Sequence, residues 1–429
     1  MAHFLGIDIG TSGCRSCLID ARAGIRAGIQ VPLPPPDRQG AAVEQDPEVW
    51  WSALAENLDR LADRAPLAGI RSITVDGTSS TLLGCSASGR PLTPALMYND
   101  ARALTAAQQV ARVAPPDCAA HGPSASLAKL LWLLQSPAGR QTRHILHQAD
   151  WLLGRLCGHY GQTDENNALK LGYDVINRCW PEWLAQLEIP PAVLPVVSPA
   201  GTPIGRLASA WCKRWGMSAD TLIVSGTTDS TAGFLATGAG PGTGVTTLGS
   251  TLVVKIGSAQ PVFAPAYGIY SHRLGTQWLV GGASNSGGAV LAQYFSAAEI
   301  EQLSRQIRPG QPTGLDYYPL VAPGERFPVN DPALAPRLDP RPDADVVFLQ
   351  GILEGIAEIE WRGYRRLAEL GAPWPERVVT TGGGAVNRAW RTIRANRLGV
   401  SVEVAAHQEA AYGAALLAHQ GYTRYKTRS

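Results

Sequence analysis

The first segment that could do chemistry is Asp8-Ile-Gly-Thr-Ser12, at the end of an apolar run near the amino terminus. Gly10 allows a tight backbone turn that exposes N–H groups, and the hydroxyls of Thr11 and Ser12 add hydrogen-bond donors. This concave donor surface suits phosphate oxygens, and Asp8 could hold a hydrated Mg²⁺ that bridges them. The alternative is an ordinary β-hairpin with a polar tip.

A second segment repeats this plan in the other half of the chain. Residues Val245–Val253 again predict a strand, a glycine turn and a strand. In this register three pairs of residues match: Gly10 with Gly249, Thr11 with Ser250, and Ser12 with Thr251. Two such hairpins indicate a duplicated fold that closes over one ligand.

A carboxylate also stands at a predicted strand-to-helix junction. Asp229 follows the apolar run Leu222–Ser225 and precedes a helix predicted over Ser230–Ala236. Open α/β sheets bind their ligands at the carboxyl ends of their strands. From this segment alone, a helix cap is the commoner role for an aspartate at such a junction.

Three consecutive glycines, Gly382, Gly383 and Gly384, follow a predicted strand over Arg377–Thr381. Their missing side chains leave a floor on which adenine and ribose can approach the backbone. A helix begins near Val386, and its amino terminus favours a nearby phosphate. Asn387 and Trp390, one turn apart, could contact the base, although core filling is an equal alternative for Trp390.

A polar cluster with the composition of a polyol site follows the predicted strand Ile73–Val75. It is Asp76-Gly-Thr-Ser-Ser80, and Asp100 with Arg102 adds to it further along the chain. A polyol needs several paired donors and acceptors, which short hydroxyl and carboxylate side chains supply. A polar turn that closes a strand is the alternative.

Strand-like and helical runs that could position these residues alternate along the chain, which indicates the α/β class. We predict strands over Phe4–Ile9, Ser16–Ile19, Ile70–Val75, Thr221–Ser225, Val245–Thr247, Leu252–Ile256 and Arg377–Thr381. We predict helices over Val49–Leu61, Leu127–Leu134, Ala149–Leu156, Ala289–Phe295, Phe348–Leu370 and Ala410–His419. The proline cluster at Pro195–Pro203 predicts a boundary between two domains, residues 1–220 and 221–429.

The composition narrows the class of protein. The 429 residues include 37 Lys+Arg and 35 Asp+Glu, a balance of +2, which argues against nucleic acid or an anionic membrane as the main partner. No apolar run approaches the roughly 20 residues that span a bilayer. The amino terminus does not read as a signal peptide, and seven scattered cysteines fit reduced thiols, so we expect a cytoplasmic protein. Cys14 and Cys17 are interpreted as packing residues.

The segment Asp8-x-Gly10-Thr11-x-x-x-Arg15-x-x-x-x-Asp20 resembles the first phosphate loop of the FGGY carbohydrate kinases, within the actin-like ATPase superfamily. Further landmarks follow in the family's order: Tyr98-Asn-Asp-Ala-Arg102, Lys129-Leu-Leu-Trp132, Thr163-Asp164 with Asn167-Ala168, Gly226-Thr-Thr-Asp229, Leu248-Gly-Ser-Thr251, Gly324-Glu-Arg326 with Pro328, Gly382-Gly-Gly384 with Asn387, and Glu409-Ala-Ala-Tyr-Gly-Ala-Ala415. The ordered set covers nearly the whole chain. The short chain and the sugar-site sequence resemble the D-ribulose kinase branch, sometimes labelled xylulose kinase-like.

The resemblance implies two actin-like (RNase H-like) domains, each a mixed β-sheet flanked by helices, with ATP and sugar in a cleft between them. It implies ATP-dependent phosphoryl transfer with Mg²⁺ at Asp8, with Asp8 and Thr11 at the phosphates and Asp229 as the general base. The implied nucleotide contacts are Gly10, Thr11, Ser12, Arg15, Gly249, Ser250, Thr251, Gly382, Gly383, Gly384, Asn387 and Trp390. The implied sugar contacts are Gly13, Asp76, Thr78, Ser79, Asp100, Arg102, Asp229 and Ser230.

The sugar-site sequence favours one substrate over others. The Gln-Met-His-Gly segment of xylulokinases is absent, as is the Arg-Glu pair of glycerol kinases, and Asp-x-Thr-x-Ser is closer to ribulose- and ribitol-type kinases. We therefore expect the protein to phosphorylate D-ribulose, with D-xylulose as the alternative. We also expect it to be a monomer or a homodimer. A catalytically silent sugar or nucleotide sensor and an actin-like filament protein are alternatives of other classes.

Overall fold

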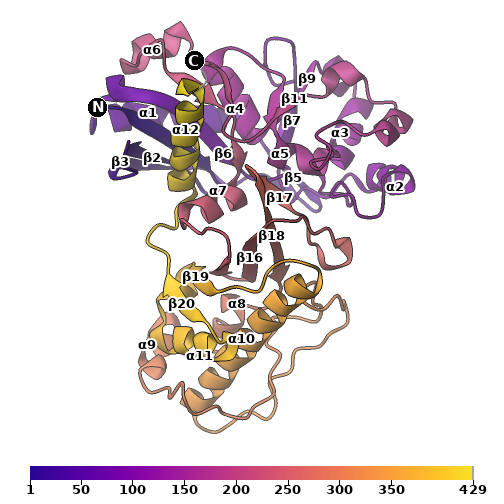
Figure 1. The fold of residues 1–429 in the computed structure, drawn as a ribbon. Helices are drawn as coiled ribbons and strands as arrows, with labels where there is room; N and C mark the ends of the chain where they lie inside the picture. Colours follow the sequence, from indigo (N-terminus) through magenta and orange to yellow (C-terminus); the bar gives the residue numbers. More distant parts are fainter. Residues whose placement is uncertain (428–429) are drawn as a thin grey trace. The chain divides into compact units, whose positions relative to one another are not determined.

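The computed structural model describes residues 1–427, which fold as two compact units (Figure 1). Unit 1 comprises Met1–Ala236 together with the C-terminal segment that starts at Glu409, and unit 2 comprises Thr237–Gln408. No helix in the described part of the chain is long and apolar enough to cross a membrane.

The main sheet of unit 1 has seven strands, in the order β12-β13-β6-β1-β2-β3, with β14 also paired to β6. Their bounds are β1 His3–Ile9, β2 Gly13–Asp20, β3 Ile25–Pro32, β6 Ile70–Gly77, β12 Pro203–Arg206, β13 Leu222–Val224 and β14 Thr227–Thr228. Because β1 and β6 run parallel, their carboxyl ends reach the same edge of the sheet. Asp8 and Asp76 lie there as register partners.

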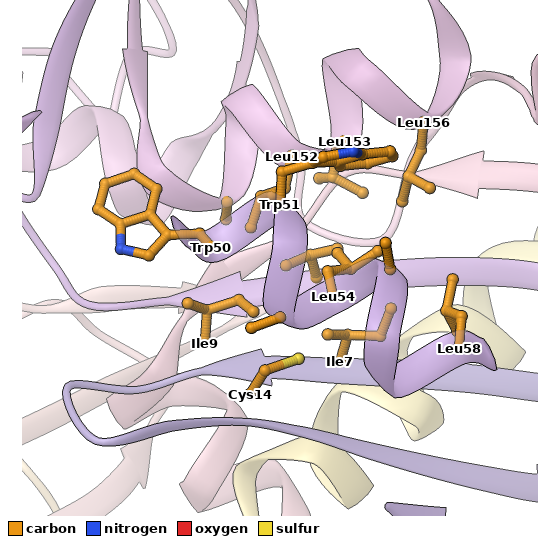
Figure 2. Packing of buried hydrophobic residues seen from close by; sticks show 14 of the residues in the cluster. Ile7, Ile9, Cys14, Trp50, Trp51, Leu54, Leu58, Leu152, Leu153 and Leu156 are labelled. Atoms are coloured by element: carbon orange, nitrogen blue, oxygen red, sulfur yellow. The ribbon is translucent and has the colours of Figure 1, made fainter. Parts of the chain in front are cut away.

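Helices cover both faces of this sheet. Successive side chains of β1 point to opposite faces, so each face carries apolar residues that pack against helices. Leu5, Ile7 and Ile9 share one core with residues of α1 (Pro47–Ala62) and α4 (Gln148–Cys157). Figure 2 shows Ile7 and Ile9 in this core. Phe4 packs on the other face against α12 (Ala410–Lys426). The first core also includes Cys14 and the second Cys17, and both thiols are buried. Their predicted role as packing residues is therefore confirmed.

The C-terminal helix α12 approaches β1 more closely than a side chain would permit. A Cβ on Gly6 would lie 2.1 Å from the backbone nitrogen of Ala415, and a Cβ on Gly413 would lie 1.9 Å from the carbonyl oxygen of Ala232 in α7 (Asp229–Ala236). These glycines let α12 pack directly on β1 and α7, which ties the end of the chain to unit 1.

The rest of unit 1 forms a smaller layer with its own core. A five-stranded sheet has the order β4-β5-β8-β7-β9. Its bounds are Asp37–Gln39, Ala42–Gln45, Ala95–Leu96, Leu82–Cys85 and His144–His147 in that order, and helices α2 Leu104–Val113 and α3 Ser126–Gln135 contribute to this core. Helix α5 Glu165–Ala168 contacts β14, and helix α6 Ser209–Trp215 packs against α1 in the main core. The short strands β10 (Gln162–Asp164) and β11 (Val196–Ser198) pair with each other.

Unit 2 contains a six-stranded sheet in the order β17-β18-β16-β15-β19-β20. The strands are β15 Thr243–Leu248, β16 Leu252–Ser258, β17 His272–Leu274, β18 Gln277–Ser284, β19 Arg377–Thr381 and β20 Ser401–Val404. The helices are α8 Gly288–Leu291, α9 Ala297–Ser304, α10 Asp345–Glu369 and α11 Arg388–Leu398. In its core Glu360 and Arg394, both fully buried, form an ion pair of 2.6 Å.

The two sheets share one topology. β1 is antiparallel to β2 and parallel to β6, and β15 is antiparallel to β16 and parallel to β19. The flanking strands β3 and β13 correspond likewise to β18 and β20. The duplicated plan predicted from the two glycine hairpins is therefore confirmed, as is the α/β class.

The predicted boundary between residues 220 and 221 is wrong. Strand β13 pairs with β6 inside the sheet of unit 1, and α7 also belongs to unit 1, so the chain leaves this unit after Ala236. The proline-rich segment contributes strands β11 and β12 instead of a linker. The helix predicted over Ala289–Phe295 is also shorter, since α8 ends at Leu291.

Candidate active site

The turn between β1 and β2 presents an open backbone. Its residues Thr11 and Ser12 are exposed, and the Gly10 N–H donates to the Gly13 carbonyl at 3.0 Å. Gly10 does not adopt a left-handed conformation, and a Cβ there would meet nothing closer than 3.5 Å. The conformation of the turn therefore does not require a glycine at position 10, contrary to the prediction. The missing side chain instead leaves the backbone accessible to a ligand.

Gly13 is different, because it lies inside the sheet. It is buried and pairs with Pro32, and a Cβ would lie 3.0 Å from the Val31 carbonyl oxygen. Packing against β3 accounts for this glycine, and the structure gives it no exposed surface for the sugar contact that was predicted.

Two carboxyl groups lie side by side beneath this turn. Asp8 and Asp76 are register partners on parallel strands, and Arg15 Nη1 lies 3.3 Å from Asp8 Oδ2. Arg15 also pairs with Glu409 at 3.7 Å. Apart from Asp8, no group among the described residues is a hydrogen-bond partner for the oxygens of the buried Asp76. Burial raises the pKa of Asp8, and burial together with the charges of Asp8 and Asp229 raises that of Asp76 well above its usual range.

Asp229 is the first residue of α7 and is partly exposed. Its Oδ1 accepts the N–H of Ser230 at 2.6 Å. The hydroxyl of Thr228 accepts the N–H of Thr231 at 3.4 Å and pairs with the Thr231 hydroxyl at 2.9 Å, so Thr228 provides the N-terminal cap. The helix therefore does not depend on Asp229 for its cap. Asp229 also belongs to unit 1, not to the C-terminal domain as predicted.

Lys170, which no motif singled out, lies in the electrostatic surroundings of Asp229. Burial lowers the pKa of Lys170, and the charge of Asp229 partly restores it. The preceding helix α5 is joined to β14 because the Asn166 side chain donates to Thr227 Oγ1 at 3.0 Å. The Asn167-Ala168 motif lies close to Lys170 in the sequence, but the motif does not include the lysine and gave no reason to select it.

The predicted polar segment after β6 is held by a glutamine that sequence reasoning also missed. Gln148 Oε1 accepts the Thr78 N–H at 3.0 Å and the Thr78 hydroxyl at 2.9 Å. Ser79 remains partly exposed, whereas Ser80 is buried with φ at +68°. The segment therefore offers a small exposed polar surface on a rigid base.

The carboxylate of Asp100 is bound to Arg102 and to the backbone of the fold. The fully buried Asp100 accepts the Val43 N–H at 2.7 Å and forms an ion pair of 2.7 Å with Arg102. Arg102 also binds Glu44. The predicted sugar contact of Asp100 is not available in this structure, because its carboxylate is used internally.

Unit 2 carries a cavity of ≈ 1130 Å³ beside its glycine hairpin. The residues that line this cavity include Gly249, Ser250, Gly288, Gly383, Val386 and Asn387. The Gly288 N–H donates to the Gly249 carbonyl at 2.9 Å, and a Cβ on Gly288 would lie 2.7 Å from the same oxygen. Helix α8 thus begins directly against the hairpin turn.

The three consecutive glycines differ in what a side chain would contact at each position. Gly382 has φ at +84°, and a Cβ on it would lie 2.5 Å from the Leu248 carbonyl oxygen. A Cβ on Gly384 would lie 2.6 Å from the Trp390 ring. Gly383 has no atom within 4 Å of its Cβ position. The predicted open floor therefore consists of Gly383, while the other two glycines permit close packing.

Asn387 and Trp390 already have intramolecular partners. Asn387 Oδ1 accepts the Trp390 N–H at 3.0 Å as the cap of α11, and its Nδ2 donates to Ser304 Oγ at 2.8 Å. Trp390 is buried, and its ring N–H donates to the Leu353 carbonyl at 3.2 Å. Core filling, the alternative considered for Trp390, describes its place in the fold.

Comparison with known proteins decides the family. Residues 3–236 match the N-terminal domain, and residues 241–421 the C-terminal domain, of the FGGY family of carbohydrate kinases. The chain belongs to this family. It is accordingly an ATP-dependent carbohydrate kinase with the two-domain α/β fold that the resemblance implied.

Named relatives support this family. The chain is similar to the xylulose kinase of Escherichia coli (strain K12), with 25% identity over 421 residues, which cover 93% of this chain and 86% of that protein. A glycerol kinase from Methylibium petroleiphilum is 33% identical over 223 residues, 48% of this chain and 45% of that protein. The fold resembles a "xyloylose kinase" from Brucella ovis, with a TM-score of 0.88 and 24% identity over 98% of this chain and 91% of that chain.

Proposed function

We propose that this kinase transfers the γ-phosphoryl group of MgATP to the terminal hydroxyl of a ketopentose, with D-ribulose preferred and D-ribulose 5-phosphate as its product. The observation that carries the proposal is the setting of Asp229. This carboxylate is partly exposed beside the buried pair of Asp8 and Asp76, and Thr228 relieves it of the capping role.

In this proposal Asp229 accepts the proton of the sugar hydroxyl as its oxygen attacks the γ-phosphorus. A carboxylate within hydrogen-bond reach both removes the proton and orients the oxygen. Ser230 supports this role, because its N–H holds one oxygen of Asp229 at 2.6 Å and fixes the orientation of the carboxylate. Lys170 lies close enough to Asp229 for their charges to interact, and the charge of Asp229 raises the pKa of Lys170 against the effect of burial.

The residues around Asp8 suit a Mg²⁺ ion. Mg²⁺ usually keeps several waters and takes one or two carboxylates together with phosphate oxygens. Asp8 and Asp76 place two carboxyl groups at one point, and Arg15 lies beside Asp8. Asp8 would hold the ion, which would neutralise charge on the phosphates. Among residues 1–427 no group of three His, Cys, Asp or Glu side chains is arranged to hold a metal ion, so phosphates and water would complete the shell.

The nucleotide contacts are proposed on two open surfaces. The cavity of unit 2 is large enough for adenosine, since ligand pockets span about 300–1,000 Å³. Gly383 provides the accessible backbone there, and the turn of Gly249, Ser250 and Thr251 provides donors for phosphate. The exposed hydroxyls of Thr11 and Ser12 provide the corresponding donors in unit 1.

The sugar contacts are proposed at Thr78, Ser79 and Arg102, with Asp76 and Asp100 acting behind them. D-ribulose leads because this chain has Asp76-Gly-Thr-Ser-Ser80 where xylulokinases have Gln-Met-His-Gly. D-xylulose is the second candidate, favoured by the xylulose kinase relative that covers 93% of this chain.

Sugar-dependent ADP release across D-ribulose, D-xylulose, pentitols and glycerol tests the proposal. We expect release with a ketopentose and a higher kcat/KM for D-ribulose than for D-xylulose. The reverse order would assign the chain to D-xylulose. Nucleotide binding without turnover on any sugar would support the silent sensor instead.

A further inference from the structure

A buried lysine joins two segments of unit 1 that are distant in sequence. Lys129 lies on α3 and is fully buried. Its Nζ donates to the carbonyl oxygen of Ser80 at 2.8 Å and to that of Met97 at 2.7 Å. One ammonium group therefore fixes two loop carbonyls at the same point.

One of these carbonyls belongs to a segment proposed to bind sugar, and the other directly precedes the second such segment. Ser80 ends the segment that begins at Asp76, and Met97 directly precedes the segment that runs from Tyr98 to Arg102. The Met97 carbonyl also accepts the N–H of Asp100 at 2.9 Å, so the lysine binds the turn that carries Asp100. The distance between these two polar segments thus depends on Lys129.

The backbone at Ser80 needs such support. Its φ of +68° lies in the left-handed region, which a residue other than glycine adopts at a cost of about 1–2 kcal/mol. Its side-chain oxygen is buried without a hydrogen-bond partner. The bond from Lys129 to the Ser80 carbonyl offsets this cost and holds the carbonyl in one direction.

Burial of Lys129 disfavours its charged form. Burial lowers its pKa to about 7, the charge of Asp100 favours the ammonium form, and Lys170 and Arg102 oppose it. Replacing so costly a group by an apolar residue of similar length would relieve the burial of charge, yet it would leave two buried carbonyls without their donor.

We propose that Lys129 is a positioning residue for the sugar, which sets the spacing of the Asp76–Ser80 and Tyr98–Arg102 segments and thereby the KM for the ketopentose. This inference rests on the proposed function. Lys129 is fully buried and its ammonium group is bound to two loop carbonyls, so its loss would act through these loops. The nucleotide cavity is lined by residues of unit 2 and contains neither segment.

The test is Lys129→Met, assayed by ketopentose-dependent ADP release at saturating MgATP and by the KM for MgATP at saturating sugar. We expect the KM for the sugar to rise about tenfold or more, as for one or two unpaired buried carbonyls, while the KM for MgATP changes less than about twofold. Lys213→Met removes an exposed lysine and is the matched control for the substitution.

The variant Leu130→Ala distinguishes a positioning role of Lys129 from a general loss of stability, because it truncates a fully buried core residue on the same helix. We expect it to lower Tm without changing the KM for the sugar. If Lys129→Met does not fold, Lys129→Gln, whose shorter side chain keeps N–H donors, should fold and show a smaller rise that is confined to the KM for the sugar. An unchanged sugar KM in a folded variant of an active kinase would overturn the inference alone. A wild type inactive on every sugar would overturn the proposed function as well.

Discussion

The two glycine hairpins occupy equivalent places in the two sheets, but they are surrounded by different chemistry. Asp8 in β1 pairs across the strands with Arg15 and Asp76. At the equivalent position of unit 2, Thr247 in β15 pairs with Val253 and Thr381. The charged residues of the first hairpin are therefore replaced by neutral ones in the second.

The consequences for hydrogen bonding are opposite. The hydroxyls of Thr247 and Thr381 bond to each other at 2.8 Å, and each is satisfied. The carboxyls of Asp8 and Asp76 are buried side by side with raised pKa values, and apart from Asp8 no group among the described residues is a hydrogen-bond partner for the oxygens of Asp76. A buried polar group without a partner destabilises the fold, so unit 1 keeps a costly arrangement that unit 2 has no need for. We interpret the first hairpin as the site of phosphoryl transfer and the second as a site of nucleotide binding.

The largest expected effect concerns Asp229, next to the charged hairpin. Asp229→Asn keeps the size and the acceptor for Ser230 but removes the basicity, so we predict that kcat falls by at least ~100-fold, in the range typical of general-base loss. Because Thr228 provides the cap, Tm should stay close to the wild-type value. Steady-state ADP release and a thermal melt measure the two effects. A well-folded variant with normal kcat would leave Asp229 without a catalytic role.

A middle-sized effect is expected where the neutral hairpin meets the consecutive glycines. Gly384→Ala places a methyl group 2.6 Å from the Trp390 ring and 3.0 Å from Leu248, and we predict a loss of about 1–3 kcal/mol of stability from overpacking. Gly383→Ala meets no atom within 4 Å, so its fold should be unaffected and its KM for ATP should rise. Urea unfolding and ATP titration separate them. Equal stability of the two variants would contradict the packing argument.

A further effect concerns the pH dependence that a buried carboxyl group gives to the stability of unit 1. Burial and the nearby charge of Asp150 raise the pKa of Asp164 to about 8, against its three hydrogen bonds from Asn166 and Asn167. Between about pH 4 and pH 8 the unfolded chain is ionised at this group while the folded chain holds the proton. Its contribution to stability is present at low pH and lost as the pH rises towards 8.

Asp164→Asn should therefore flatten the pH profile of stability. The difference between wild type and variant should change by up to about 1.4 kcal/mol per pH unit between pH 5 and pH 8. Urea midpoints at three pH values in that interval measure it. Parallel profiles for the two proteins would mean that Asp164 titrates normally.

Much of the fold could be predicted because strands and helices follow local hydrophobic patterns. The strand over Arg377–Thr381 was predicted with its observed bounds, and the hairpin repeat revealed the duplication. The domain boundary was missed because β13 joins β6, about 150 residues earlier in the chain, through parallel pairing that no local pattern records.

At Thr11 and Asp229 a motif coincides with a side chain that is at least partly exposed, and their roles stay predictions. The sequence does not predict the parts of the candidate site that depend on packing. The sequence cannot tell Gly383, which is open, from Gly384, which faces a ring. The sequence also does not show that the Asp100 carboxylate binds Val43 and Arg102. Nor does it show that Lys129 and Gln148 bind the polar loops.

The most direct test of the contrast between the hairpins rebuilds the neutral pair in unit 1. In the double variant Asp8→Thr with Asp76→Thr, two hydroxyls replace the two buried carboxyls, as in the pair of Thr247 and Thr381. Quenched-flow measurement of phosphoryl transfer from ATP to the sugar, together with the Kd for ADP and the Tm, decides the outcome. We predict that transfer falls by at least ~100-fold, while the Kd stays within about threefold and Tm is unchanged or higher. Retained transfer, or a loss of ADP binding as large as the loss of transfer, would contradict the assignment of chemistry to the charged hairpin.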